Sequence, residues 1–153
     1  VQKFPPEKDE TDLELALDAA LVMNPDSIWI IGALGKRMDQ SLANIFLLAR
    51  DAYAGVDIRL IDGTRELFLI RRSGQIEGVP GERVSLLPLH GPAHGVRTQG
   101  LLYPLKDETL YPDRTRGISN ELIAPSAQIT LQSGLLICIH AFSETNQKGG
   151  SND

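Results

Sequence analysis

The sequence predicts an α/β layer over residues 1–62, followed by an all-β part, an antiparallel β-sandwich, over residues 63–142. In the first part, helical repeats of apolar residues alternate with short apolar runs, which is typical of helices covering a parallel sheet. In the second part, turn signals separate several short β-rich runs, which is typical of a sandwich or barrel. The polar, glycine-rich segment 143–153 is expected to be a flexible tail.

The first helix is expected to begin at a capping box. Thr11 and Glu14 have the spacing at which two side chains satisfy backbone amides at a helix start. Apolar residues then repeat at intervals of three and four up to about Met23, where Asn24 and Pro25 end the helix.

Two short apolar runs, 27–31 and 57–61, predict parallel strands with a second helix between them. That helix is expected from about Asp39 to Ala54, with Gly55 as its C-terminal cap. Its apolar face would consist of Leu42, Ile45, Phe46, Ala49 and Ala52. Two strands and two helices bury too little surface for a stable open sheet. The α/β part is therefore expected to be incomplete, either as a fragment or because another chain supplies the missing strands.

The sandwich is expected to begin after the turn at Asp62-Gly63, with further turns at Ser73-Gly74 and Pro80-Gly81. Between and after these turns, strands are expected at 64–72, 75–79, 83–89, 95–99, 127–132 and 135–141.

Composition excludes several classes of protein. A hydrophobic content of 42% excludes wholesale disorder. Nearly all of the net charge of −5 comes from residues 7–14, and no basic stripe favours nucleic-acid binding. No apolar run approaches the roughly 20 residues of a membrane span. Cys138 is the only cysteine, is expected in the core, and is compatible with a cytoplasmic location.

The segment PEKDETD places Asp9 and Asp12 at a helix start. Carboxylates there can hold Mg²⁺, while Lys8 and the helix amides hold a phosphate. The simpler interpretation is that these acids cap the helix and complement its dipole.

The segment GALGKRMDQSLANI follows the first apolar strand directly, at the sheet edge where α/β proteins bind ligands. Gly32 and Gly35 allow tight turns, Lys36 and Arg37 can neutralise phosphate, and Asp39 lies at the next helix start. The spacing matches neither a Walker A loop nor a dinucleotide fingerprint. A structural turn capped by Asp39 is the alternative.

The histidines do not favour a metal site. Gly91 and Pro92 separate His90 from His94, so no helix presents both to one ion. Cys138 and His140 alternate along a strand and can share a face, but two ligands do not make a zinc site.

The segment TRGISNE, residues 115–121, lies between β-rich runs and is compatible with an ordinary turn. Alternatively, Ser119 and Asn120 can hydrogen-bond a heterocycle. The apolar wall beside it would consist of Leu102, Tyr103 and Leu105.

Together, PPEKDETDLELAL, GALGKRMDQSLANI, GVRTQGLLYPL and TRGISNELI resemble the thiamine pyrophosphokinase family, in order and spacing from about Phe4 to Ile139. The resemblance implies transfer of a pyrophosphoryl group from ATP to the hydroxyethyl oxygen of thiamine, giving thiamine diphosphate and AMP. It implies Mg²⁺ as cofactor and ATP as co-substrate. It also implies a homodimer whose active sites lie between domains of two subunits.

For this chain, the resemblance implies that residues 1–62 are the C-terminal part of a Rossmann-like nucleotide-binding domain and that the sandwich binds thiamine. Asp9, Asp12 and Asp39 would hold the metal, and Arg37 would lie close to the reacting phosphates. Asp39 is also a candidate acceptor for the proton of the thiamine hydroxyl. The nucleotide and phosphate would further contact Lys8, Thr11, Gly32, Gly35 and Asn44, and thiamine would contact Ser119, Asn120 and Leu105.

The chain departs from the family pattern at three places. Lys36 stands where the family usually has glycine, and Gln40 stands where bacterial members often have histidine. The family's N-terminal segments resembling ADGGA and GDFDS are absent, which agrees with the incomplete sheet. A non-catalytic module that binds thiamine or thiamine diphosphate, or an inactive fragment, is therefore the alternative to an active enzyme.

Overall fold

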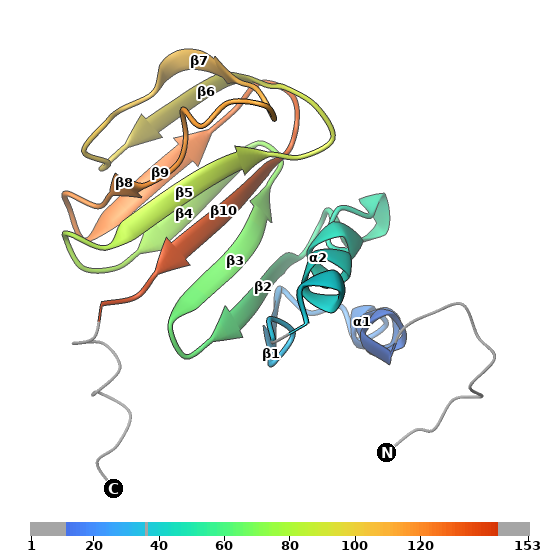
Figure 1. Cartoon of the computed structure of the whole chain (residues 1–153). Coiled ribbons are helices and arrows are strands. Elements are labelled where there is room, and N and C mark those ends of the chain that lie inside the picture. Colours follow the sequence, from blue (N-terminus) through green and yellow to red (C-terminus); the bar gives the residue numbers. More distant parts are fainter. Residues whose placement is uncertain (1–11, 36, 144–153) are drawn as a thin grey trace, which may run out of the picture.

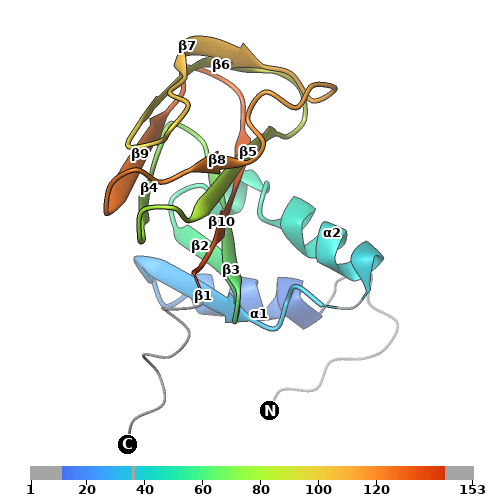
Figure 2. The ribbon, with the colours of Figure 1, turned by 60° about the vertical axis from the view of Figure 1, so that its left-hand side comes forward.

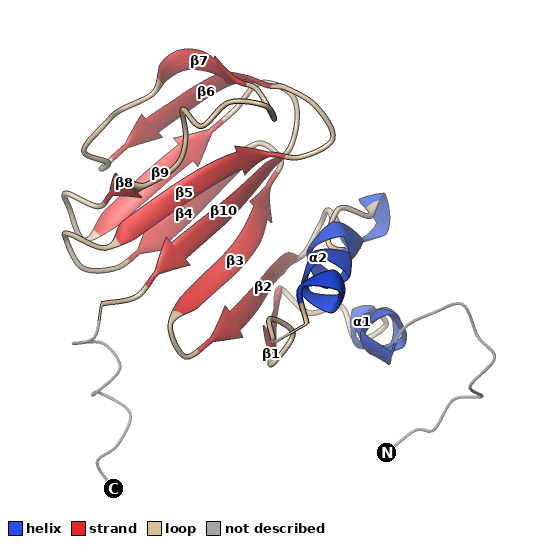
Figure 3. Cartoon of the chain, in the orientation of Figure 1, coloured by secondary structure: helices blue, strands red, loops and turns tan. Residues whose placement is uncertain are grey.

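A computed structural model describes residues 12–35 and 37–143. The described chain forms a six-stranded sheet and a four-stranded sheet, with helices at the end of the molecule that carries the first two strands (Figures 1 and 3). The strand order is β1-β2-β3-β10-β5-β8 in the larger sheet and β4-β9-β6-β7 in the smaller one. Of these pairs, only β1 and β2 are parallel. The fold class predicted from the sequence is confirmed.

The α/β layer comprises two short helices, a 3₁₀ turn and two strands. Their bounds are α1 Asp12–Leu21, β1 Ser27–Ile31, α2 Met38–Leu47, η1 Asp51–Tyr53 and β2 Asp57–Asp62. Leu17 of α1, and Ile45 and Leu48 at α2, pack on one face of β1, β2 and β3, together with Ile58 and Leu60. Figure 2 shows both helices beside this end of the sheet.

The sandwich comprises the remaining eight strands. Their bounds are β3 Arg65–Ile70, β4 Ser73–Glu77, β5 Arg83–Pro88, β6 Ala93–Gln99, β7 Lys106–Leu110, β8 Asn120–Glu121, β9 Ser126–Thr130 and β10 Leu136–Ala141. Alternate residues of these strands point inward and form a second core, which includes Phe68, Ile76, Val84, Ile129 and Cys138. The prediction that Cys138 is a core residue is confirmed. Burial raises the pKa of its thiol.

One hairpin joins the α/β layer to the sandwich. The Asp62 carboxylate accepts hydrogen bonds from the backbone N–H groups of Thr64 and Arg65, at 2.8 and 3.0 Å, and so fixes the turn between β2 and β3. The two strands pair antiparallel, and the six-stranded sheet therefore runs through both parts. The boundary predicted near residue 62 falls in this hairpin and stays a prediction.

The predicted length of the second helix is wrong. Helix α2 ends at Leu47, and the following amides bond carbonyls three residues back, which tightens the chain into turns. The Arg71 guanidinium, from the turn after β3, donates to the carbonyls of Leu48 and Arg50 at 3.1 and 3.0 Å. A contact between distant segments thus ends the helix, and Gly55 does not cap it.

The predicted apolar face of that helix is also wrong in part. Leu42 and Phe46 are 44% and 49% exposed, whereas Ile45 and Leu48 pack against the core. A short helix has room for only a narrow buried stripe, so the outer apolar residues stay in contact with solvent.

Two strands were not predicted, and one predicted turn is a strand. β7 is a polar run at the edge of the four-stranded sheet, and β8 pairs only with Arg83 and Val84. Ser73 and Gly74 begin β4. A Cβ at Gly74 would lie 2.8 Å from the side chain of Ile70, so this glycine permits close packing within a strand.

Among the described residues, no helix combines the length and the apolar character needed to cross a membrane.

Candidate active site

The glycine turn, defined here as residues 32–35 together with Arg37, leads from β1 into α2. Gly32 has a φ of +84°, a left-handed conformation in which a side chain would be strained. The turn lies at the carboxyl end of the parallel pair, where ligands bind in open α/β sheets. Lys36 lies outside the described residues.

Arg37 and Asp39 form a bidentate ion pair beside this turn. Arg37 Nη2 donates to Asp39 Oδ2 at 2.7 Å, and Arg37 Nε donates to Asp39 Oδ1 at 3.2 Å. Hydrogen bonds from Arg37, and then from the backbone N–H of Gln40, lower the pKa of Asp39. Both side chains are exposed, so the pair can rearrange around a ligand. Asp39 is therefore ionised and a weak proton acceptor.

Helix α2 holds the glycine turn through two polar side chains. Ser41 Oγ accepts the Gly35 N–H and donates to the Arg37 carbonyl, both at 3.1 Å. Asn44 Nδ2 donates to the Ala33 carbonyl at 2.9 Å. The structure thus brings Gly32, Gly35 and Asn44 together, as predicted for a common site, although the Gly35 amide is already engaged.

A pocket of about 270 Å³ opens behind the glycine turn. It lies between α2 and the helix-covered face of β3 and β10. Its lining is largely apolar and consists of Leu34, Gly35, Met38, Ser41, Ile45, Arg65, Leu67 and Ile139.

The acidic motif lies mostly outside the described residues, since Lys8, Asp9 and Thr11 precede them. Asp12 is exposed and begins α1, as expected from the sequence. Among the described residues, no three His, Cys, Asp or Glu side chains gather into a metal site. Mg²⁺ usually takes only one or two protein carboxylates and completes its shell with phosphate and water, so the oxygen donors of Asp12 and Asp39 fit it chemically.

The second group of predicted residues lies in the sandwich. Asn120 is buried, and its side chain both accepts the Tyr103 N–H at 3.0 Å and donates to the Tyr103 carbonyl at 2.7 Å. Ser119 is exposed, has a φ of +61°, and donates its N–H to Ser85 Oγ at 3.0 Å. Asn120 is thus a clamp on the loop that carries Leu102 and Tyr103, called the 103 loop below, and not an open donor.

The predicted apolar wall is different from the observed one. Leu105 is buried in the sandwich core and does not face solvent. Tyr103 is 58% exposed, and Leu102 and Ile123 are also exposed. Leu102 donates its N–H to the Glu121 carbonyl, and Ile123 donates to that of Gly100, so the two segments lie side by side. The exposed side chains of Leu102, Tyr103 and Ile123 therefore form an apolar patch next to the buried Asn120.

The two groups of residues lie at opposite edges of one sheet. The glycine turn follows β1 at one edge, and Asn120 belongs to β8 at the other. Since neighbouring strands are about 4.8 Å apart, five steps from β1 to β8 separate the groups by about 24 Å. One chain does not bring both groups into one site.

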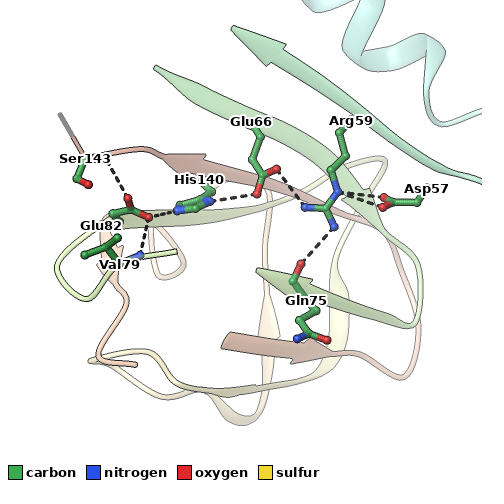
Figure 4. A network of polar contacts seen from close by, with 8 residues as sticks. All are labelled: Asp57, Arg59, Glu66, Gln75, Val79, Glu82, His140 and Ser143. Atoms are coloured by element: carbon green, nitrogen blue, oxygen red, sulfur yellow. Dashed lines mark hydrogen bonds and ion pairs between the residues drawn. The ribbon is translucent and has the colours of Figure 1, made fainter. Parts of the chain in front are cut away.

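Sequence reasoning missed a polar network in the sandwich (Figure 4). His140 is fully buried, with Nδ1 3.1 Å from Glu66 Oε1 and Nε2 2.5 Å from Glu82 Oε2. Glu66 also accepts from Arg59 Nη1 at 3.2 Å. Burial opposes the charged imidazole, but hydrogen bonds to Glu66 and Glu82 outweigh it and raise the pKa of His140. The network is a buried clamp between strands, and only the strand alternation of His140 with Cys138 could have indicated it.

Both halves of the chain match known families. The model of the thiamin pyrophosphokinase catalytic domain matches residues 1–60, and that of the thiamin pyrophosphokinase vitamin B1 binding domain matches residues 70–136.

Named relatives and solved structures agree with these matches. Thiamine pyrophosphokinase of Bacillus subtilis is 37% identical over 137 residues, which is 88% of this chain and 64% of the relative. Thiamine pyrophosphokinase 1 of Oryza sativa subsp. japonica is 26% identical over 85% of this chain and 53% of its own length. The chain therefore spans less than two thirds of these two relatives.

The structure of the Bacillus subtilis enzyme superposes with a TM-score of 0.82 at 36% identity, over 90% of this chain and 65% of that one. The structure of a thiamin pyrophosphokinase family protein from Enterococcus faecalis has a TM-score of 0.79 at 30% identity, over 93% of this chain and 68% of that one. With sequence and fold in agreement over both halves, the chain belongs to the thiamin pyrophosphokinase family.

Proposed function

We propose that the protein transfers a pyrophosphoryl group from ATP to the hydroxyl of thiamine, giving thiamine diphosphate and AMP. The observation that carries this proposal is the likeness of both halves, catalytic and vitamin-binding, to relatives named for that activity. In this proposal, the glycine turn binds the phosphates and the 103 loop binds thiamine.

On the phosphate side, Arg37 is the side chain suited to grip a phosphoryl group, since its planar fork binds phosphate oxygens in pairs. Asp39, with Asp12 and Asp9, would hold Mg²⁺, which when bound neutralises charge on the transferred phosphates. The lowered pKa of Asp39 supports this role and argues against its accepting the proton of the thiamine hydroxyl. The turn and α2 supply positioning, which is most of the catalysis in phosphoryl transfer.

On the thiamine side, the exposed patch at Leu102, Tyr103 and Ile123 offers an apolar surface for a flat heterocycle. Ser119 is close to Ile123 in sequence and is open to solvent, so its hydroxyl can hydrogen-bond the ring substituents. Asn120 acts indirectly, because its amide holds the Tyr103 backbone in place.

The separation of the two sides supports a homodimer. The glycine turn and the 103 loop lie at opposite edges of one sheet, so a second copy is needed to complete each site. In a two-fold dimer, each glycine turn would face the 103 loop of its partner, giving two equivalent sites.

A thiamine-binding module without transferase activity is the second candidate. Its support is the contrast between a closed sandwich core and an α/β layer in which the described residues form two strands, with Trp29 and Ile31 of β1 69% and 81% exposed. A cytoplasmic location stays a prediction of the sequence.

The test is product formation. With ATP, Mg²⁺ and thiamine, AMP and thiamine diphosphate are expected to appear in equal amounts and only when thiamine is present. Thiamine-independent ATP hydrolysis as the sole activity would contradict the proposal. Calorimetry separates the second candidate, since thiamine binding without Mg-ATP binding is expected of the module alone.

A further inference from the structure

Around Gly35, the glycine turn owes its shape to α2 rather than to local sterics. Gly35 has no positive φ, and nothing lies within 4 Å of where its Cβ would stand. Local sterics therefore do not fix the chain here. What fixes it is a set of hydrogen bonds from side chains one turn into the helix.

Ser41 stands at the centre of these bonds. Its hydroxyl accepts from Gly35 N–H and donates to the Arg37 carbonyl, and its own backbone N–H donates to the same carbonyl, each at 3.1 Å. The hydroxyl thus links the Gly35 N–H to the Arg37 carbonyl. No cap is formed by the Arg37 side chain, which turns instead to Asp39.

We propose that Ser41 is a positioning residue for the reacting phosphates, which it acts on through Gly35 and Arg37; this rests on the proposed function. The hydroxyl ties the backbone on either side of position 36 to α2. It leaves the Arg37 guanidinium and Asp39 carboxylate at the mouth of the turn.

The geometry also indicates which hydrogen-bond donor of the turn can contact an anion. Because Ser41 occupies the Gly35 N–H, this amide is not the one that meets an anion, and the contact falls to Arg37. Without the hydroxyl, the Gly35 amide is released and the backbone around Arg37 loses one of its two ties to the helix. A ligand would then have to order the turn when it binds, which weakens binding.

Threonine and valine provide a matched pair of substitutions. Threonine keeps a hydroxyl that bonds the carbonyl four residues back in a helix, whereas valine has nearly the same shape and no hydroxyl. Both carry the same cost of a branched side chain in α2, so the difference between them reports the hydroxyl.

We expect Ser41→Val to raise the KM for Mg-ATP about fivefold, the effect of losing one hydrogen bond, with the KM for thiamine unchanged. Ser41→Thr is expected to keep the wild-type KM for both substrates. Thr109→Ala is a control that removes a hydroxyl bonded to His94 in the four-stranded sheet, far from the glycine turn, and should also keep both values.

Equal KM values for Mg-ATP in the valine and threonine variants would overturn the inference, as would a valine variant in which both substrates are affected alike. Absence of any thiamine-dependent AMP formation by the wild-type protein contradicts the proposed function instead. In that case, calorimetric Kd values for Mg-ATP test Ser41 with the same pair of variants.

Discussion

At the scale of single residues, the Arg37–Asp39 pair determines what the glycine turn can do. The hydrogen bonds from Arg37 lower the pKa of Asp39 and keep this carboxylate ionised, and both side chains remain open to solvent. An exposed ion pair contributes little to folding. Its contribution is therefore expected in ligand binding and catalysis, where both groups can turn to phosphate and metal.

Replacing Asp39 separates these roles. Asp39→Ala is expected to reduce thiamine diphosphate formation about 100-fold or more, because it removes a metal ligand and frees Arg37 from its partner. The melting temperature of the sandwich should not change. Asp51→Ala, an exposed aspartate in η1, is the matched control. Turnover of the Asp39 variant at the wild-type rate would remove this residue from the mechanism.

His140 shows how a single buried group couples stability to pH. Both ring nitrogens face carboxylates, so the imidazole is held charged between Glu66 and Glu82, with Arg59 behind Glu66. Because its pKa is raised on folding, its contribution to stability is full below the unfolded value, about 6.5, and is lost as pH rises through the folded value. The lowered pKa values of Glu66 and Glu82 give the opposite dependence in acid.

We therefore expect His140→Gln to reduce the free energy of unfolding by about 3 kcal/mol at pH 6, since two buried carboxylates lose their shared cation. The loss should shrink as pH rises above about 6.5, because the wild-type protein then loses the same interaction. Urea unfolding at several pH values measures this. His94→Gln, an exposed histidine, is the control, and a loss that grows with pH would contradict the account.

At the scale of elements, the end of α2 depends on a distant strand turn. Arg71 donates to two carbonyls of the segment after α2, and so ties the α/β layer to the turn between β3 and β4. Carbonyl groups at a partly buried helix end are costly to leave without hydrogen-bond donors, and the Arg71 guanidinium supplies these donors. The same contact explains why the helix is shorter than its sequence pattern.

Arg71→Ala is expected to destabilise the protein by about 1–2 kcal/mol through the loss of these two bonds. Hydrogen exchange should quicken at the amides of residues 48–50 while those of the sandwich core stay protected. Arg72→Ala, at the exposed neighbouring position, should leave exchange unchanged. Equal effects of the two substitutions would show that the guanidinium of Arg71 does not hold the segment.

The sequence predicts elements well where local patterns decide them. The apolar runs of β1 and β2 and the alternating strands β3, β5 and β10 lie where periodicity places them. The sequence predicts too long a second helix because Arg71, far along the chain, ends α2. β7 and β8 are missed because one is a polar edge strand and the other has two residues.

The site follows the same rule. Gly32, Arg37, Asp39 and Asn44 gather because a strand, a turn and a helix follow one another directly. The burial of Leu105 and the clamp role of Asn120 depend on the pairing of distant loops, which spacing does not reveal. The Glu66–His140–Glu82 network joins three separated segments and is likewise invisible in any local pattern.

At the scale of the whole molecule, each proposed site is shared between two chains, because the glycine turn and the 103 loop occupy opposite edges of the six-stranded sheet. A variant impaired on one side should therefore be rescued by a variant impaired on the other. Arg37→Ala impairs the phosphate side, and Asn120→Ala releases the 103 loop on the thiamine side.

Mixing these two variants and measuring thiamine diphosphate is the most direct test. After subunit exchange at equal amounts, half of the dimers pair the two variants, and each such dimer has one intact site of two. The mixture is expected to recover about a quarter of the wild-type rate, whereas each variant alone is expected to be nearly inactive. Activity no greater than the mean of the separate variants would contradict a site shared between two chains.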